Sequence, residues 1–445
     1  MAVPTGAAAR QAILCERPRI SLLRYDEDYS FLQDPRCRTD PWDRLKYLPL
    51  TRHGSAHLTL GLDVRERFEH FSGFEWGGGF LEPDDFLLQR VMPFADVRAG
   101  ELQAFFQLTS NLVWGSDPRP LDRDDLDVLQ AFVSASVGPF TLRAGRQEVQ
   151  FASSRLVSIR EGPNVRLAFD GLRAILRAGK WEIDGLALLP VQVREGFFDD
   201  RSEWGQKFWG VYATGPALGP SLGFDFYYLG RFRGTAAFEQ GTARELRHTV
   251  GTRIWGEPAR WDYNFEFAYQ VGTFGPGRIR AWMVASDTGY TLDLPAEPRI
   301  GAQANAFSGD SNPGSPDLQT FNPLFPRGAY FSQANLIGPL NLIDVHPGLL
   351  LRPIEALEIT LDWDFFWRQS LGDGLYMPST LLQVAGAGNP ERYVGSQGAV
   401  LVEWQITRHA DLGATWSRFF AGPFLRFAGF SDDVDFIGLW ISYAI

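Results

Sequence analysis

Apolar and polar side chains alternate along the segment ITLDWDFFWRQS, residues 359–370. The apolar set stands at the odd positions Ile359, Leu361, Trp363, Phe365 and Trp367. The even positions are mainly polar and include Asp362, Asp364 and Arg368. A period of two predicts a β-strand with one apolar and one polar face. In a soluble sandwich the aromatic face would form the core, whereas in an outer-membrane barrel it would face lipid and the charged face would line a pore.

The same alternation recurs along most of the chain. In LGFDFYYLGRFR (222–233), Phe224 and Phe226 share one face, and Asp225 and Arg231 share the other. Strands are predicted at 57–71, 84–99, 101–114, 125–137, 138–150, 165–178, 181–195, 206–214, 222–233, 244–256, 260–271, 277–291, 298–308, 340–352, 359–370, 394–408, 409–420 and 434–445. The total is roughly eighteen strands of the length that a membrane barrel needs.

The links between these strands differ in length in a regular way. Short links such as GPF (138–140) and AGK (178–180) alternate with longer ones at 116–125, 310–333 and 371–392. Short turns at one rim and long loops at the other are typical of outer-membrane barrels. We therefore expect an all-β fold with a single transmembrane β-barrel of about 18 antiparallel strands, short periplasmic turns and long extracellular loops. Trp363 and Trp367 would then face lipid.

The expected domain organisation is an N-terminal periplasmic segment at 1–52 followed by the barrel at 53–445. After residue ~50 the chain has no Pro/Ser-rich linker and no break in composition, which favours one closed sheet over several soluble domains. A soluble β protein stays open as an alternative. No apolar run approaches the ~20 residues of a membrane-spanning helix.

Composition narrows the possible partners. The formal net charge of −11 argues against nucleic acid. The basic residues are almost all arginine, because lysine occurs only at 46, 180 and 207. A GC-rich genome would explain this bias, and so would a site for carboxylates or phosphates, which guanidinium groups bind in bidentate fashion.

Two features of the N-terminal region bear on location. Cys15 and Cys37 either pair in an oxidising periplasm or remain free thiols, and their spacing alone does not decide. The first residues, MAVPTGAAARQAILC, lack the apolar region of a secretory signal. We expect a mature chain of the bacterial outer membrane that begins after its signal peptide, and a cytosolic protein is the alternative.

If the polar strand faces point inward, the lumen collects many charges. The expected inward arginines are Arg65, Arg67, Arg143, Arg173, Arg194, Arg231, Arg233, Arg247, Arg253, Arg280, Arg352 and Arg368. The carboxylates expected beside them are Asp63, Asp170, Asp184, Asp225, Glu266 and Asp362. Such residues either bind a passing anion or form ladders of opposite charge across neighbouring strands.

The sequence contains no recognisable catalytic motif. None of its six histidines belongs to an HExxH pair, and GxSxG, Walker and CxxC motifs are absent from the sequence. A catalytic pair of carboxylates, as in glycosidases, is an alternative, although the sequence does not indicate which two residues would form it. We expect no enzyme activity, no cofactor and no metal.

Several stretches resemble the alginate-export porin family of bacterial outer membranes. They are LLRYDEDYSFLQDP and RTDPWDRLKYLPL within 22–50, LGLDVRERFE (60–69), LRAGRQEV (142–149), FDGLRA (169–174), TFNPLFPRGAYF (320–331), TRHADLGATWSRFFAGPFL (407–425) and DDVDFIGLW (432–440). The chain departs from the pattern at its end, where Ile445 stands in place of the usual Phe.

The resemblance implies a barrel whose arginine-lined constriction passes a linear polyuronate to the outside. It implies that Arg65, Arg90 and Arg146 belong to this constriction and that Arg327 approaches the pore from the extracellular side. The full candidate substrate-binding set is Arg65, Arg67, Arg90, Arg143, Arg146, Asp170, Arg173, Arg194, Arg231, Arg247, Arg352, Asp362 and Arg368.

The expected function is export of an anionic exopolysaccharide such as alginate by a monomeric porin. Its expected partners are the polysaccharide, outer-membrane lipid and a periplasmic secretion protein. One alternative is an uptake porin for small organic acids. Another, of a different class, is an outer-membrane enzyme that acts on lipid or glycan.

Overall fold

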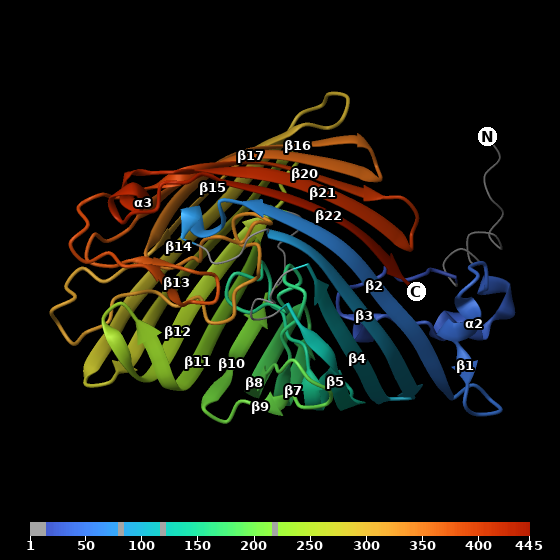
Figure 1. Cartoon of the computed structure of the whole chain (residues 1–445). Coiled ribbons are helices and arrows are strands. Elements are labelled where there is room, and N and C mark those ends of the chain that lie inside the picture. Colours follow the sequence, from blue (N-terminus) through green and yellow to red (C-terminus); the bar gives the residue numbers. More distant parts are fainter. Residues whose placement is uncertain (1–14, 79–83, 116–121, 216–220) are drawn as a thin grey trace.

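Eighteen antiparallel strands close into a single barrel in the computed structural model, which describes residues 15–78, 84–115, 122–215 and 221–445 (Figure 1). The wall strands are β2 (Ala56–Ser72), β3 (Asp84–Ala99), β4 (Leu102–Trp114), β5 (Asp124–Val137), β6 (Phe140–Gln147), β7 (Phe169–Ala178), β8 (Trp181–Gln192), β10 (Gln206–Thr214), β11 (Gly223–Phe238), β12 (Gly241–Gly256), β13 (Trp261–Phe274), β14 (Gly277–Thr291), β15 (Arg299–Phe307), β16 (Leu342–Ile354), β17 (Leu357–Arg368), β20 (Tyr393–Gln405), β21 (Ala410–Ala421) and β22 (Val434–Ala444). Each predicted strand coincides with one of them.

The barrel closes where the last strand pairs with the first. β22 is antiparallel to β2, with Arg65 opposite Ser442, so the sheet has no open edge. The turns beside the start of β2 are mostly short, and the opposite rim carries the loops 148–168, 308–341 and 369–392. This confirms the predicted arrangement of short periplasmic turns and long extracellular loops.

The alternating faces have the predicted directions on most strands. On β17, Trp363 is 42% exposed, whereas Asp364 and Arg368 are buried. The aromatic face therefore points to lipid and the charged face to the lumen. β14 is different, because Ile279 and Ala281 point inward and Arg280 is exposed. The prediction that Arg280 faces the lumen is wrong, because the inner face of β14 is apolar.

That apolar inner face has a partner inside the barrel. The loops 308–341 and 369–392 pack into the lumen, and Phe307, Phe321 and Leu324 join Ile279 in one buried hydrophobic cluster. A small hairpin of β18 (Leu375–Tyr376) and β19 (Leu382–Val384) lies in the second of these loops. Part of the lumen is thus filled by folded loops, and the wall strands facing them need apolar side chains.

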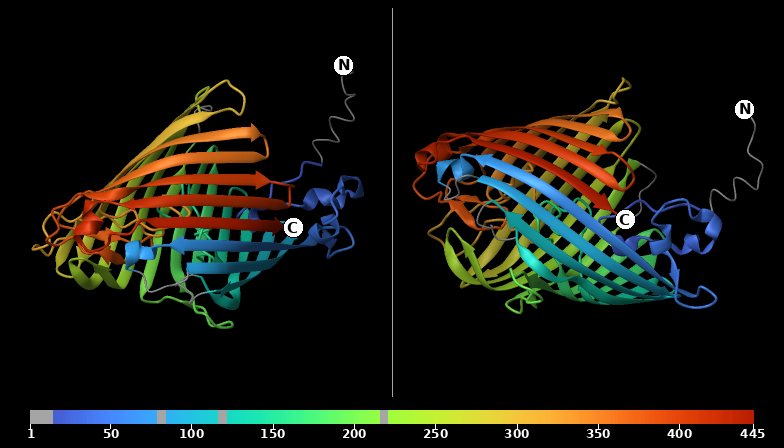
Figure 2. Two further views of the ribbon diagram at one scale, coloured as in Figure 1. Left: turned by 45° about the horizontal axis from the view of Figure 1, so that its top comes forward. Right: turned by 45° about the vertical axis from the view of Figure 1, so that its right-hand side comes forward.

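The N-terminal segment lies at the periplasmic rim, beside the C-terminus (Figures 1 and 2). It contains the 3-10 turns η1 (Arg24–Asp26), η2 (Ser30–Gln33) and η3 (Pro35–Cys37), the short helix α2 (Asp43–Lys46) and β1 (Leu48–Pro49), which pairs with β2. Cys15 and Cys37 form a disulfide, which resolves the open choice between paired and free thiols. The predicted domain boundary at 52/53 falls between β1 and β2, and residues 1–14 lie outside the described part.

The remaining elements are short. They are η4 (Phe74–Gly77) and α3 (Pro423–Phe427) in extracellular loops, and β9 (Arg201–Ser202), which pairs with the end of β8. In the described ranges, no helix has the length and apolar character to cross a membrane.

Candidate pore constriction

The loop 148–168 crosses the lumen and narrows it. At one end Phe151 stacks on Tyr212 of β10, with ring centroids 4.5 Å apart. Arg155 forms an ion pair of 3.0 Å with Glu266 of β13. On the opposite wall the Asn164 side-chain amide donates to the carbonyl of residue 89 on β3 at 3.1 Å. Because the loop bonds to both walls, a solute passing through the barrel has to move past it.

Three arginines converge on one carboxylate of this loop. Arg65 of β2 lies directly opposite Arg90 of β3 in the sheet register. Glu161 accepts a hydrogen bond from Arg90, and its Oε1 lies 3.6 Å from Arg65 Nη1. Its Oε2 lies 3.0 Å from Nε of Arg166, which is equally close to Glu148. We call these five residues the Glu161 cluster.

The charge balance of the Glu161 cluster fixes the state of its central carboxylate. Burial alone would favour the neutral acid, but Arg90, Arg166 and Arg65 hold the pKa of Glu161 at about 2. Glu161 is therefore ionised at neutral pH. Three guanidinium groups meet two carboxyl groups here, so buried positive charge gathers beside the crossing loop.

Below the crossing loop, the N-terminal segment enters the periplasmic mouth. The Tyr25 hydroxyl donates to the Glu148 carbonyl at 3.0 Å. The Tyr25 ring packs edge-on against Phe105 and Phe132, and the Arg143 guanidinium lies 4.0 Å from the Tyr25 ring centroid. The segment therefore packs directly beneath the constriction, on the β4–β6 side of the barrel.

Above the crossing loop lies a cavity of about 480 Å³, which we call the outer vestibule. Arg67 of β2, Arg160 of the crossing loop and Arg327 of the loop 308–341 line it. Arg67 pairs with Glu69 at 2.7 Å, and Arg327 donates to the Tyr330 carbonyl. Among the described residues, the Arg160 guanidinium has no ion-pair partner. Burial lowers its pKa to about 10, which still leaves it cationic at neutral pH.

Other predicted arginines hold the inward loops in place. Arg231 donates to the Leu324 carbonyl at 2.6 Å, and Arg247 donates to the Thr320 carbonyl at 3.2 Å. Arg368 is fully buried and donates to the carbonyls of residues 371, 373, 386, 389 and 391. Arg231 also donates to the Gln206 side chain, and Arg247 donates to Glu245 and Gln270, so these buried guanidinium groups have little capacity left for a solute.

Three more of the predicted residues pair along the wall. Arg173 binds Asp184 at 2.6 Å, Arg352 binds Glu358 at 2.7 Å near the periplasmic rim, and Asp362 lies 3.3 Å from His346. Arg194 lies in the loop after β8. These contacts are the charge ladders that the sequence left as an alternative to anion binding.

Arg146 stands apart from Arg65 and Arg90. Its neighbour Gly145 has a φ of 130° and faces Gly171, whose φ is 148°, and this irregularity interrupts the alternation. The Arg146 side chain donates to Asp170 at 2.9 Å and lies 3.6 Å from Asp127. The structure thus brings together two of the three arginines that the resemblance placed in one constriction.

The sequence reasoning missed the residues supplied by the inward loops. Glu161, Arg166, Arg155 and Arg160 all lie in the segment between β6 and β7, which has no alternation to give their direction. The three arginines at 155, 160 and 166 were the available signal, because arginines in a long loop of a barrel can reach the lumen.

Comparisons with known proteins agree with this architecture. The model of the family described as alginate export matches residues 56–435. Among solved structures, the chain is similar to Pseudomonas aeruginosa OccK11 (OpdR), with 12% identity, a TM-score of 0.56 and coverage of 87% of this chain and 96% of that one. OccK3 (OpdO) of the same organism gives 12% identity, a TM-score of 0.59 and coverage of 87% and 95%.

A third similar structure is Pseudomonas aeruginosa OccK2 (OpdF) in complex with glucuronate, with 10% identity, a TM-score of 0.57 and coverage of 87% and 98%. A search of curated protein sequences found no match. At such identities the structural likeness establishes the fold, a porin-like barrel, and the family match across most of the chain establishes the relationship. The chain belongs to the alginate export family.

Proposed function

We propose that this protein exports an anionic polysaccharide, a polyuronate such as alginate, across the bacterial outer membrane. The observation that carries the proposal is the succession of cationic sites along the lumen, from the Glu161 cluster to Arg160 and Arg327 in the outer vestibule. Membership of the alginate export family supports the substrate class.

Successive sites suit a chain with one carboxylate per sugar. A carboxylate leaving the Glu161 cluster would meet Arg160 and Arg327 while the following sugar enters behind it. Conduction requires binding that is strong enough for entry and weak enough for release. Because Glu161 already shares its charge among Arg65, Arg90 and Arg166, these guanidinium groups would hold a passing carboxylate only weakly.

Uptake of small organic acids is the second candidate. It is favoured by the structural likeness to OccK2, which was crystallised with glucuronate, a single sugar acid. The outer vestibule, about 480 Å³ in volume, falls within the usual range of small-molecule sites. Both candidate functions are transport of a solute that is not chemically changed. Hydrolysis of a labelled oligouronate or lipid by the purified protein would contradict both of them.

The deciding experiment measures the reversal potential of the protein in a planar bilayer under a salt gradient, with oligouronate or glucuronate added to either side. Export of a polyuronate predicts anion selectivity and block by oligouronates at concentrations where glucuronate has little effect. Equal block by the monomer would favour uptake. The double variant Arg160→Gln/Arg327→Gln should reduce both selectivity and block.

Arg177→Gln is the matched control, because this arginine lies at a periplasmic turn and its side chain is 60% exposed. A wild-type channel with no anion preference and no response to uronates would overturn the anionic substrate while leaving the barrel intact.

A further inference from the structure

The barrel wall contains a gap that a loop fills. β6 pairs with β5 only between Ala131 and Val137, because after Gln147 the chain turns into the lumen. Closer to the extracellular rim, β5 bonds to the loop 193–205 instead. Asp125 N donates to Glu195 O at 3.3 Å, and Phe198 N donates to Leu126 O at 2.9 Å. This loop covers the part of β5 that β6 does not reach.

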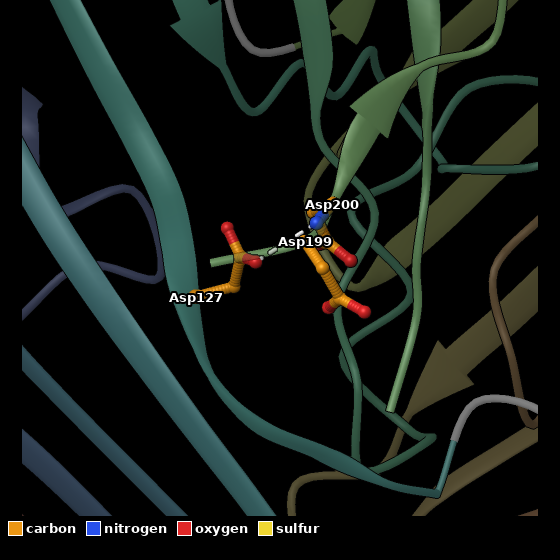
Figure 3. Close-up of side chains that lie close together, drawn as sticks. All are labelled: Asp127, Asp199 and Asp200. Carbon is orange, nitrogen blue, oxygen red and sulfur yellow. Dashed lines mark hydrogen bonds between the residues drawn. The ribbon is translucent and has the colours of Figure 1, made fainter. Parts of the chain in front are cut away.

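Three carboxylates meet where the loop joins the wall. One oxygen each of Asp127 on β5 and of Asp199 and Asp200 in the loop lies within 4.8 Å of the others (Figure 3). Asp127 accepts backbone hydrogen bonds from Val128 at 2.6 Å and from Asp200 at 2.9 Å. Asp200 accepts one from the backbone N–H of Arg194 at 2.7 Å. The acids are therefore held in place, although their charges repel one another.

A fourth carboxylate has no donor at all within the described residues. Asp124 is fully buried, and neither of its carboxylate oxygens has a hydrogen-bond partner there. The charges that act on it most strongly are those of other acids, namely Asp200, Asp127, Asp199 and Asp125. Oδ1 of Asp199 is also buried without a partner. Buried carboxylate oxygens that face other carboxylates indicate a missing positive charge.

Two arginines near the acids in the described part of the chain are engaged by other carboxylates. Arg146 Nη1 lies 3.6 Å from Asp127, but its Nε and Nη2 donate to Asp170. Arg123 is bonded to Asp125 at 2.8 Å, and 42% of its side chain is exposed. The four acids Asp124, Asp127, Asp199 and Asp200 thus keep an excess of negative charge.

We propose that Asp124, Asp127, Asp199 and Asp200 bind a calcium ion that fastens the loop 193–205 to β5 at the extracellular rim. Ca²⁺ takes six to eight oxygen ligands in flexible geometry, and four carboxylates with backbone carbonyls and water can provide them. The donor set contains no thiolate or imidazole, which excludes a preference for softer metals. The bound ion would join this loop to β5 in addition to the backbone hydrogen bonds between them.

Calcium binding to the protein itself is measured first. The chain is refolded in detergent free of lipopolysaccharide, so that lipid phosphates contribute no sites, and Ca²⁺ is titrated by calorimetry. We expect a dissociation constant on the order of 10⁻⁴–10⁻³ M, as in extracellular calcium modules. In Asp199→Asn/Asp200→Asn the affinity should fall at least about tenfold, because two charged ligands become neutral.

Asp432→Asn is the matched control, because Asp432 is exposed in another extracellular loop. It should bind Ca²⁺ like the wild type. The absence of binding by the wild-type protein would overturn the proposal, as would unchanged binding by the double variant, which would place the ion elsewhere.

Protease protection provides a readout that needs only the wild-type chain. Arg194 and Arg201 lie in the loop and are trypsin sites. With Ca²⁺ present, cleavage after these residues should slow at least about fivefold relative to EDTA, because local opening must release the ion first. Cleavage at equal rates with and without Ca²⁺ would contradict the proposed role in fastening the loop.

Discussion

Arg65 and Arg90 face each other across the β2–β3 pair, and Glu161 from the crossing loop contacts both. Two like charges at directly opposed positions of a sheet destabilise it unless a counter-charge is present. A side chain of the loop 148–168 therefore neutralises a wall site that β2 and β3 cannot neutralise themselves. The folding of this loop and the electrostatics of the pore are coupled through one carboxylate.

Glu161→Gln should raise anion selectivity and lower stability together. The substitution removes the charge that Arg65, Arg90 and Arg166 share, which leaves them available to permeant anions. The loss of stability should be about 1–3 kcal/mol, below the value for a fully buried pair, because 35% of the Glu161 side chain is exposed. Reversal potentials and urea unfolding measure the two effects. Glu182→Gln at an exposed periplasmic ion pair should change neither.

Tyr25→Ala should open the periplasmic mouth. The ring contacts Phe105 and Phe132 and lies under Arg143, so its removal takes away the main apolar anchor of the N-terminal segment. We expect a higher single-channel conductance and faster trypsin cleavage at Arg17 or Arg24. Tyr25→Phe keeps the packing and loses only the hydrogen bond to the Glu148 carbonyl, worth about 1 kcal/mol. If both variants conduct like the wild type, the segment does not restrict the pore.

Arg368→Met should destabilise the protein without changing selectivity. Its guanidinium donates to five loop carbonyls and lies 4.2 Å from the Phe424 ring centroid. The substitution therefore leaves several buried carbonyl oxygens without a hydrogen-bond donor. A loss of at least about 3 kcal/mol is expected. The comparison variant is Arg177→Met at an exposed site. A change in ion selectivity in the folded Arg368→Met variant would show that Arg368 contacts the transported solute.

Alternation along the chain was sufficient to predict the barrel. On β17 the polar residues Asp362, Asp364 and Arg368 occupy one face, and a strand of a membrane barrel can point that face only toward the lumen. The same rule failed at Arg280, because the inward loops make the inner face of β14 apolar and its outer face carries the arginine. Local sequence cannot reveal which wall strands face a folded loop.

In the candidate site too, the residues on strands could be predicted from the sequence and those in the inward loops could not. Arg65 and Arg67 follow from the phase of β2, and the resemblance supplied Arg90. Glu161 and Arg166 had no such basis, because their positions depend on where a 21-residue connection between β6 and β7 folds back. The prediction that Arg368 points into the lumen is correct, but its guanidinium holds a loop in place. The direction of a side chain alone does not distinguish a loop-holding arginine from one that binds a solute.

Stability should fall as the pH rises through neutrality, and Glu148 should be responsible. Burial raises the pKa of Glu148 to about 7, although Arg166 opposes the shift. The unfolded chain has an ordinary glutamate pKa of about 4.3, so the folded state binds this proton more tightly. The contribution is fully present below about pH 4 and is lost as the pH rises through about 7, with a total of about 4 kcal/mol. Urea unfolding at about pH 5 and about pH 8 tests it. Glu148→Gln keeps an acceptor for the Gln130 amide and should remove the difference, whereas Glu182→Gln should keep it. An unchanged pH dependence in Glu148→Gln would assign the effect to another group.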